Sequence, residues 1–223
     1  GWEFRSDWSI TFQGYNGGPS SGPVKKWKGT PVKQLVIACE QGIGDEIIYA
    51  SAIPELIVRL GHEPLELQCH PRLFKVFERS FRIRCTPRRV LSQIEDDVVA
   101  LADLFMFYRR DQSHFPKKPF LKADPVVRLK FLDRLENYPR PWIGIAWNSR
   151  HGRLDVGQLL KKLEPMGGTR FNLQYGEKDD RLVDIQPDPL EDMEGHLNFI
   201  SCLDRMVSVT QTVVHEAGAL GIP

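Results

Sequence analysis

The stretch of sequence that decides the fold runs from residue 35 to residue 46 and reads LVIACEQGIGDE. Its first five residues are apolar and include two β-branched side chains, which is typical of a buried parallel strand. Beyond the glycines, apolar residues recur at helical spacing as far as Leu60. A strand, a glycine-rich turn and a helix in this order indicate an open α/β sheet, whose strand ends are where ligands usually bind.

The glycine-rich turn differs from the two common nucleotide-binding motifs. Gly42 and Gly44 allow the backbone to approach a ligand closely, and Asp45 places a carboxylate at the predicted start of the helix. Ile47 stands where a dinucleotide fingerprint has its third glycine, and no Gly-Lys-Ser/Thr follows the turn. The turn is therefore neither a nicotinamide-type loop nor a Walker loop.

Predicted strands and helices alternate along the chain after residue 33. The first set comprises strands at 34–39, 64–69, 82–85 and 98–101 and helices at 45–60 and 71–79. The second comprises strands at 142–147, 170–174 and 205–209 and helices at 155–164, 191–202 and 212–220. Alternation of this kind predicts parallel βαβ units. We expect Pro54 to kink the first helix or to remove one of its hydrogen bonds.

The same pattern predicts the domain organisation. Residues 1–33 are aromatic, rich in Gly and Pro and aperiodic, so they form a lead-in rather than a regular element. Two Rossmann-like domains follow, at 34–140 and 141–223. The polar and basic segment 105–140, which contains several prolines, is predicted to cross between the two domains.

Composition narrows the class of protein. The chain has 223 residues, of which 41% are apolar and 26% charged, as in an ordinary globular protein. No apolar run approaches the ~20 residues of a membrane helix, and we expect no secretory signal before the first domain. The four cysteines are widely spaced and do not have zinc-ligand spacing, which favours reduced thiols and a cytoplasmic protein without a metal site.

Charge is unevenly distributed between the two predicted domains. Residues 1–140 carry 22 Lys and Arg against 17 Asp and Glu, whereas residues 141–223 carry 8 against 12. No basic motif with interleaved aromatic residues is present, so we expect no nucleic-acid partner. The basic excess is interpreted as a solvated surface or as a face for an anionic acceptor.

Several motifs together resemble one family. The sequence EQGIGD at 40–45 resembles the signature of the bacterial tetratricopeptide-linked glycosyltransferases, which are relatives of the ADP-heptose:lipopolysaccharide heptosyltransferases. Matching pieces follow the family order: GWEF at 1–4, WKG at 27–29, PFL at 119–121, IGIAWN at 143–148, LQYG at 173–176 and HEAGALGIP at 215–223. The resemblance implies a GT-B fold, with two Rossmann-like domains and a central cleft. It also implies tetratricopeptide repeats outside this chain and a second domain that continues beyond Pro223.

The resemblance also implies a set of site residues. Asp45 corresponds to the base that deprotonates or orients the acceptor hydroxyl, although a plain helix cap explains it equally well. His215 is the second catalytic candidate, with a buried or surface helical histidine as the alternative. Gln41, Gly42 and Gly44 form the acceptor-side loop. The donor-binding residues would be Trp147, Asn148, Ser149, Arg150, Gln174, Tyr175, Gly176, Thr210, Thr212 and Gly218.

The family resemblance implies an activity and leaves alternatives open. It implies a metal-independent, inverting glycosyltransferase without a cofactor, which moves a sugar from a nucleotide sugar to a glycan, lipid-linked or protein acceptor. The chain has Thr210-Gln211-Thr212 where the heptosyltransferases have Asp-Thr-Gly or Asp-Thr-Ala. This departure favours the alternative of a non-catalytic sugar-binding or scaffolding module. A nucleotide-sugar epimerase, which shares the two-domain architecture, is a third interpretation.

Overall fold

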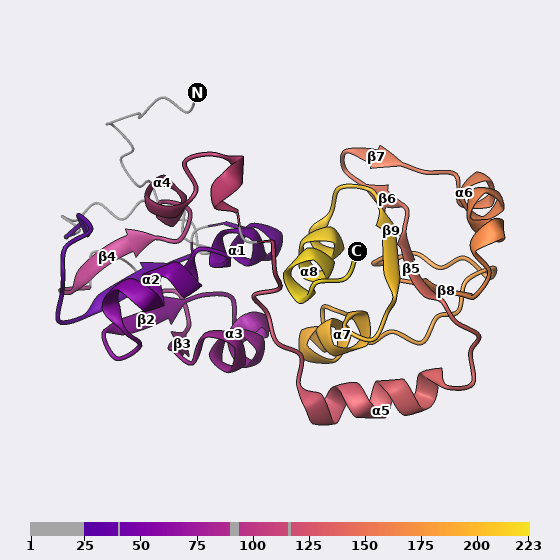
Figure 1. Cartoon of the computed structure of the whole chain (residues 1–223), viewed down its shortest axis with the longest axis horizontal. Coiled ribbons are helices and arrows are strands. Elements are labelled where there is room, and N and C mark those ends of the chain that lie inside the picture. Colours follow the sequence, from indigo (N-terminus) through magenta and orange to yellow (C-terminus); the bar gives the residue numbers. More distant parts are fainter. Residues whose placement is uncertain (1–24, 40, 90–93, 116) are drawn as a thin grey trace.

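The computed structural model describes residues 25–39, 41–89, 94–115 and 117–223. These residues form two α/β units that lie side by side along the long axis of the molecule (Figure 1). Most of the predicted lead-in, residues 1–24, and Glu40 lie outside the described residues. No helix in the described part of the chain is both long and apolar enough to cross a membrane.

The first unit contains a parallel sheet with the strand order β3-β2-β1-β4. Its elements are β1 (Leu35–Ala38), α1 (Ile43–Ala50), α2 (Ile53–Leu60), β2 (Leu65–Gln68), η1 (Pro71–Leu73), α3 (Phe74–Phe81), β3 (Arg84–Thr86), β4 (Asp97–Ala100), α4 (Leu104–Tyr108) and η3 (Gln112–His114). Strand β1 is buried on both faces, as the apolar run predicts. Leu35 and Ile37 join the main core under the helices, and Val36 and Ala38 pack on the opposite face.

The single helix predicted at 45–60 is two helices in the structure. Helix α1 ends at Ala50, and α2 begins at Ile53 with Pro54 in its first turn. Proline has no N–H group, and its ring collides with the carbonyl group four residues earlier in a continuous helix. The predicted kink at Pro54 is therefore a complete break.

The end of the lead-in is part of the first unit. Lys26 forms a parallel bridge with Val98, and the Trp27 main-chain N–H donates to the Val98 carbonyl at 2.8 Å. The Trp27 side chain is buried in the main core and lies against Phe107, with 5.1 Å between the ring centroids. This segment thus extends the sheet beyond its edge strand β4.

The second unit has a smaller parallel sheet with the strand order β8-β5-β9. Its elements are β5 (Trp142–Ala146), β6 (Asn148–Ser149), β7 (Gly152–Arg153), α6 (Val156–Leu163), η4 (Glu164–Met166), β8 (Thr169–Asn172), α7 (Met193–Ile200), β9 (Arg205–Ser208) and α8 (Thr212–Leu220). Helices cover both faces of this sheet. Helices α7 and α8 lie on the side toward the first unit, and α6 lies on the far side (Figure 1).

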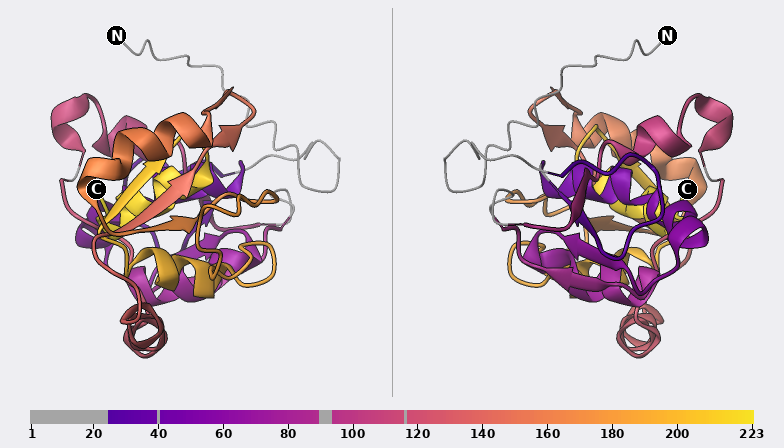
Figure 2. Two further views of the ribbon diagram at one scale, coloured as in Figure 1. Left: turned by 90° about the vertical axis from the view of Figure 1, so that its right-hand side faces the viewer. Right: turned by 90° about the vertical axis from the view of Figure 1, so that its left-hand side faces the viewer.

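Helix α5 (Pro125–Leu135) is a correction to the sequence prediction, which assigned this region to a crossing segment. Its amino end carries two start signals, because Asp124 accepts hydrogen bonds from the N–H groups of Val126 and Val127 and Pro125 occupies the first turn. Phe131 and Leu135 on its inner face are buried in the second core. The end-on views show α5 on the outside of the molecule, beyond α7 (Figure 2).

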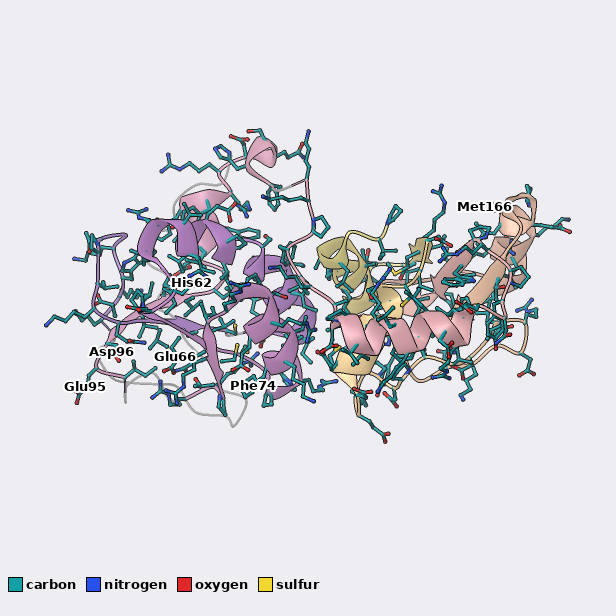
Figure 3. The ribbon with its side chains drawn as sticks, turned by 60° about the horizontal axis from the view of Figure 1, so that its bottom comes forward. His62, Glu66, Phe74, Glu95, Asp96 and Met166 are labelled. Carbon is teal, nitrogen blue, oxygen red and sulfur yellow. The ribbon has the colours of Figure 1, made fainter. Side chains whose placement is uncertain are left out.

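The two units meet through a continuous apolar contact. Met193, Leu197 and Ala219 of the second unit belong to the same core as β1 and α1 of the first. An ion pair joins Arg79 on α3 to Glu194 on α7 at 2.6 Å. The outer ends of the molecule lie far from this contact, with Glu95 and Asp96 near one end and Met166 at the other (Figure 3).

Candidate functional site

A cavity of about 280 Å³ lies where the two units meet. Its walls come from the segments that follow β1, β2, β8 and β9, together with α7 and the first turns of α8. It is thus located at the carboxyl ends of strands from both sheets, which is the usual ligand position in open α/β folds. The volume is near the lower limit of about 300 Å³ for small-molecule sites.

Two helix amino ends open into this cavity without a side-chain cap. Helix α1 begins after Gly42 and α8 begins after Gln211, and neither cap residue makes a side-chain hydrogen bond to its helix. Among the other helices, Asp124, Asp155 and Asp192 cap α5, α6 and α7, whereas α2 and α3 also begin without a side-chain cap. Free N–H groups at a helix amino end carry partial positive charge and attract anions. The arrangement favours an anionic ligand group between α1 and α8.

Two cationic or hydrogen-bonding side chains complete this part of the wall. Arg72 lies in the segment after β2, and its Nη1 donates to the Pro189 carbonyl of the second unit at 2.9 Å. His70 Nδ1 accepts a hydrogen bond from the Arg72 main-chain N–H at 3.2 Å. Burial, with the positive charges of Arg72 and Arg88, lowers the pKa of His70. Neutral His70 therefore carries its proton on Nε2 and can donate it. The sequence analysis missed both residues, and their only signal was their position after a strand.

The contact between α1 and α8 lies beside the cavity and involves Gly44, Asp45 and His215. A Cβ atom on Gly44 would lie 3.2 Å from Thr212 Oγ1 and 3.4 Å from His215 Cδ2, so a larger residue requires these two side chains to give way by a few tenths of an ångström. Burial lowers the pKa of His215, and the nearby charges of Asp45 and Glu216 oppose that change. Asp45 and His215 are thus close enough to interact, although neither lines the cavity.

The structure corrects the interpretation of Asp45 as a helix cap. Gly42 is the cap residue of α1, and Asp45 is the third residue of the helix, where its side chain makes no capping hydrogen bond. Its neighbour Glu46 has a structural role, because it is buried, forms an ion pair with Arg88 and accepts the His70 main-chain N–H at 3.0 Å. Burial raises the pKa of Glu46 in spite of these contacts.

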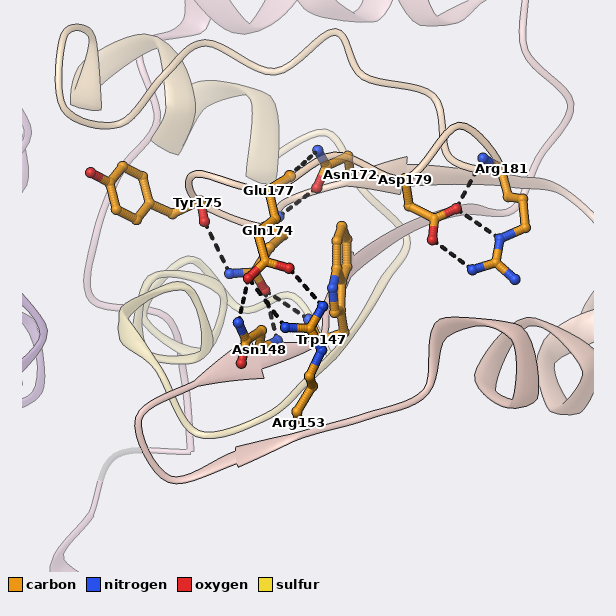
Figure 4. A network of polar contacts seen from close by, with 9 residues as sticks. All are labelled: Trp147, Asn148, Arg153, Asn172, Gln174, Tyr175, Glu177, Asp179 and Arg181. Carbon is orange, nitrogen blue, oxygen red and sulfur yellow. Dashed lines mark hydrogen bonds and ion pairs between the residues drawn. The ribbon is translucent and has the colours of Figure 1, made fainter.

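The polar residues after β5 and β8 form a network that supports the strand ends (Figure 4). Gln174 Oε1 accepts the main-chain N–H groups of Trp147 at 2.9 Å and of Asn148 at 2.8 Å. The Asn148 side chain donates to Glu177, which also forms an ion pair with Arg153 at 3.0 Å. The side-chain amide of Gln174 and the Asn148 side-chain nitrogen are therefore engaged within the protein.

Trp147, which the family resemblance makes a donor-binding residue, is not part of the cavity wall. Its side chain is buried in the core beneath α6, together with Ile143, Ile145 and Val156. Alternate residues of a strand share one face, so Trp147 continues the inward face of Ile143 and Ile145.

The other predicted site residues divide into two groups. Gln41, Gly42, Tyr175 and Thr212 line the cavity, and Tyr175 is half exposed there. Ser149, Arg150, Gly176, Thr210 and Gly218 are not part of its wall. Ser149 and Arg150 lie at the β6–β7 hairpin, and Thr210 and Gly218 are exposed next to and within α8. The described residues hold no group of three or more His, Cys, Asp or Glu side chains placed to bind a metal ion.

Two buried residues of the cavity wall were absent from the sequence prediction. His196 on α7 and Glu216 on α8 form a pair, with 3.0 Å between His196 Nε2 and Glu216 Oε2. They are 20 positions apart in the sequence, and only the packing of α7 on α8 brings them together.

Comparisons with known proteins agree with the two-unit architecture. The chain is similar in structure to the glycosyl transferase family 9 protein of Veillonella parvula DSM 2008, with a TM-score of 0.63, 10% identity and coverage of 87% of this chain and 80% of that chain. It is also similar to the E. coli ADP-heptose lps heptosyltransferase II, with a TM-score of 0.60, 12% identity and coverage of 85% and 83%. The fold is therefore the GT-B-like fold of these glycosyltransferases.

Sequence comparison identifies one relative and no family. No protein-family model matches the chain. "Protein FlbA" of Caulobacter vibrioides (strain ATCC 19089 / CIP 103742 / CB 15) is 27% identical over 241 residues, which cover 90% of this chain. The chain spans 40% of the length of that curated relative.

Proposed function

We propose that this chain is the GT-B part of a glycosyltransferase that moves a sugar from a nucleotide sugar to an acceptor hydroxyl. One observation carries the proposal: the uncapped amino ends of α1 and α8 and the Arg72 side chain border a single cavity at the strand ends. A diphosphate leaving group needs such positive potential, which can be supplied without a metal ion. The glycosyltransferase fold and a neighbour named for ADP-heptose support the same ligand class.

Named residues would divide the work between the units. Thr212, Gln41 and Gly42 would contact the diphosphate, and Tyr175 would lie against the nucleoside. Asp45 would orient or deprotonate the acceptor hydroxyl in an inverting, metal-independent transfer. Neutral His215, which lies beside Asp45, would form a hydrogen bond with the same acceptor hydroxyl. Following the family resemblance, the acceptor would be a glycan, a lipid-linked sugar or a protein, and tetratricopeptide repeats would accompany this chain in a cytoplasmic protein.

Calorimetric titration tests the proposal. ADP, GDP, UDP and CMP are titrated into the protein with and without EDTA. At least one should bind, and EDTA should not change its dissociation constant. Arg72→Gln should weaken binding about tenfold or more, because a charge-assisted hydrogen bond contributes about 1.5–3 kcal/mol. Arg84→Gln, which removes an exposed arginine outside the cavity wall, is the matched control. Lack of binding by every nucleotide would refute the nucleotide-sugar proposal.

A non-catalytic module is the second candidate. It is favoured by Thr210-Gln211-Thr212, which replaces the acidic residue that the heptosyltransferase resemblance implies at the start of α8. The enzyme and a sugar-binding module both predict nucleotide binding, whereas a scaffolding module does not. They differ in turnover, so hydrolysis or transfer from a nucleotide sugar that binds would support the enzyme, and saturated binding without turnover would support the module.

A further inference from the structure

The Glu46–Arg88 ion pair joins three of the segments that follow strands of the first sheet. Glu46 lies in α1, after β1, and Arg88 lies after β3. The Glu46 side chain is only 1% exposed, and its Oε2 accepts the main-chain N–H of His70, after β2, at 3.0 Å. Arg88 Nη2 also donates to the main-chain carbonyl of Gln41 in the glycine-rich turn. The pair thus contacts two residues of the cavity wall and is not itself part of that wall.

Stability alone is a poor explanation for this pair. The attraction of two buried charges offsets the loss of their hydration only where the geometry and further hydrogen bonds are good. Burial raises the pKa of Glu46 in spite of Arg88 and the His70 N–H, so the loss of hydration outweighs these contacts. Apolar side chains of similar volume often give equal or greater stability. A buried ion pair can instead serve to fix one arrangement of the chain.

The hydrogen bond from Arg88 fixes the direction of the peptide group between Gln41 and Gly42. This peptide is trans, so its carbonyl and its N–H point in opposite directions. With the carbonyl on Arg88, the Gly42 N–H points away from Arg88, and Gly42 lines the cavity. Turning the peptide plane over would exchange the two groups and give residue 42 a positive φ, which glycine adopts without strain. The turn therefore needs an outside contact to keep one direction.

We propose that the Glu46–Arg88 pair is a positioning device that keeps the Gly42 N–H directed at the ligand phosphate and the Gln41 carbonyl directed away from it. The inference rests on the proposed function, which places the phosphate at this turn. A reversed peptide would present a carbonyl oxygen, whose partial negative charge repels a phosphate. Glu46 acts through Arg88, because its carboxylate holds the guanidinium against the turn. Both are positioning residues that act on the ligand only through the turn.

A double substitution tests the device without leaving a buried charge unpaired. Glu46→Gln with Arg88→Leu, the paired variant, removes both charges and the donor to the Gln41 carbonyl. Glu66→Gln with Arg89→Leu is the matched control, because the Arg89 side chain pairs with Glu66 on β2 and neither residue lines the cavity. Thermal melting of both variants establishes that they are folded.

Calorimetry with inorganic pyrophosphate, ADP, GDP and UDP measures the effect on binding. The paired variant should weaken each probe that wild type binds about tenfold or more, because molecules with a reversed peptide lose a hydrogen bond to a charged group. The control should bind as wild type does. Glu46→Gln alone is nearly isosteric and keeps Arg88, so it should fold and weaken the same probes in the same direction. Wild-type affinity in a folded Glu46→Gln protein and in the paired variant would overturn the inference.

Adding Gly42→Ala distinguishes control of the peptide from a general loosening of the turn. Among the described residues, a Cβ atom at position 42 would have only Asp45 Oδ2 within 4 Å, at 3.5 Å, so alanine fits the present conformation. Alanine disfavours the positive φ of the reversed peptide. The paired substitution should therefore weaken binding less in the Gly42→Ala background than in wild type. Equal losses in the two backgrounds would refute control of the peptide.

Crystal structures of the ligand-free proteins show the direction of the peptide independently of binding. The Gln41 carbonyl should point to Arg88 in wild type and should be reversed, or present in both directions, in the paired variant. The same single direction in both proteins would contradict the inference whether or not a probe binds. If wild type binds no probe but the carbonyl reverses in the variant, the proposed function fails and the control of the peptide by Arg88 stands.

Discussion

Gly44 offers the sharpest test of how the two units fit together. A Cβ atom at this position would lie 3.2 Å from Thr212 Oγ1, 3.4 Å from His215 Cδ2 and 3.5 Å from Thr212 Cα. The two contacts with side-chain atoms are tighter than most Cβ contacts, so the Thr212 and His215 side chains must move by a few tenths of an ångström. Overpacking of this kind typically costs about 1–3 kcal/mol. Gly218, in the same pair of helices, has nothing within 4 Å of its Cβ position and provides the comparison.

Both Gly→Ala changes gain helix propensity, by up to about 1 kcal/mol. The difference between their free energies of unfolding therefore measures the contact of residue 44 with α8. Gly218→Ala should raise the free energy of unfolding by about 0.5–1 kcal/mol. The free energy of unfolding of Gly44→Ala should be about 1–3 kcal/mol lower than that of Gly218→Ala, and that of Gly44→Leu should be lower still. Urea unfolding followed by tryptophan fluorescence measures all three. Equal stabilisation by the two alanine variants would show that α1 and α8 are not in close contact, and the site described between them would be wrong.

Three further predictions concern single side chains. Asp45→Asn should lower turnover about 100- to 10,000-fold if Asp45 acts as the base. It should change the free energy of unfolding by only about 0.3–1 kcal/mol, because the Asp45 side chain makes no capping hydrogen bond. Wild-type turnover in this variant would exclude the role of Asp45 as the base. The lowered pKa of His215 means that the unfolded chain binds more protons just below pH ~6.5, so stability should fall as pH falls through this range. Urea titrations of wild type and His215→Gln at several pH values should show a smaller fall in the variant. The same pH dependence in the two proteins would contradict this prediction. His70, whose pKa is also lowered, contributes in the same direction to wild type and variant. Gln174→Leu leaves two main-chain N–H groups without their acceptor and should cost about 2–4 kcal/mol in thermal or urea unfolding, and a purely ligand-binding role would instead leave stability unchanged.

The sequence was sufficient to predict the central strands β1 and β5, because their apolar runs are buried on both faces. The break at Pro54 was also predictable, since it depends only on the chemistry of proline. Helix α5 was missed although Asp124 and Pro125 form a clear start signal. Charged residues on its outer face and the prolines before it obscured the helical spacing of Val127, Phe131 and Leu135.

Errors at the site have a different cause. A residue at the end of a strand can face the ligand or the core, and the alternation in β5 already indicated that Trp147 shares the face of Ile143 and Ile145. The contact of Gly44 with α8 could not be predicted from the sequence, because it depends on how α1 packs against a helix about 170 residues further along the chain. Strand position thus predicts where the cavity lies better than it predicts which side chains line it.

The cavity wall combines main-chain and side-chain polar groups, which leave very different traces in a sequence. The main-chain N–H groups at the starts of α1 and α8 follow from the positions of turns and can be predicted from strand and helix patterns. The His196–Glu216 pair depends on how α7 packs against α8, and neither residue has a local pattern that distinguishes it from an ordinary helical side chain. Substitutions on the inner faces of α7 and α8 can therefore change the side chains of the wall while the turn motifs stay the same. Sequence motifs in this fold predict where the cavity lies, and only the packing of these two helices shows which side chains line it.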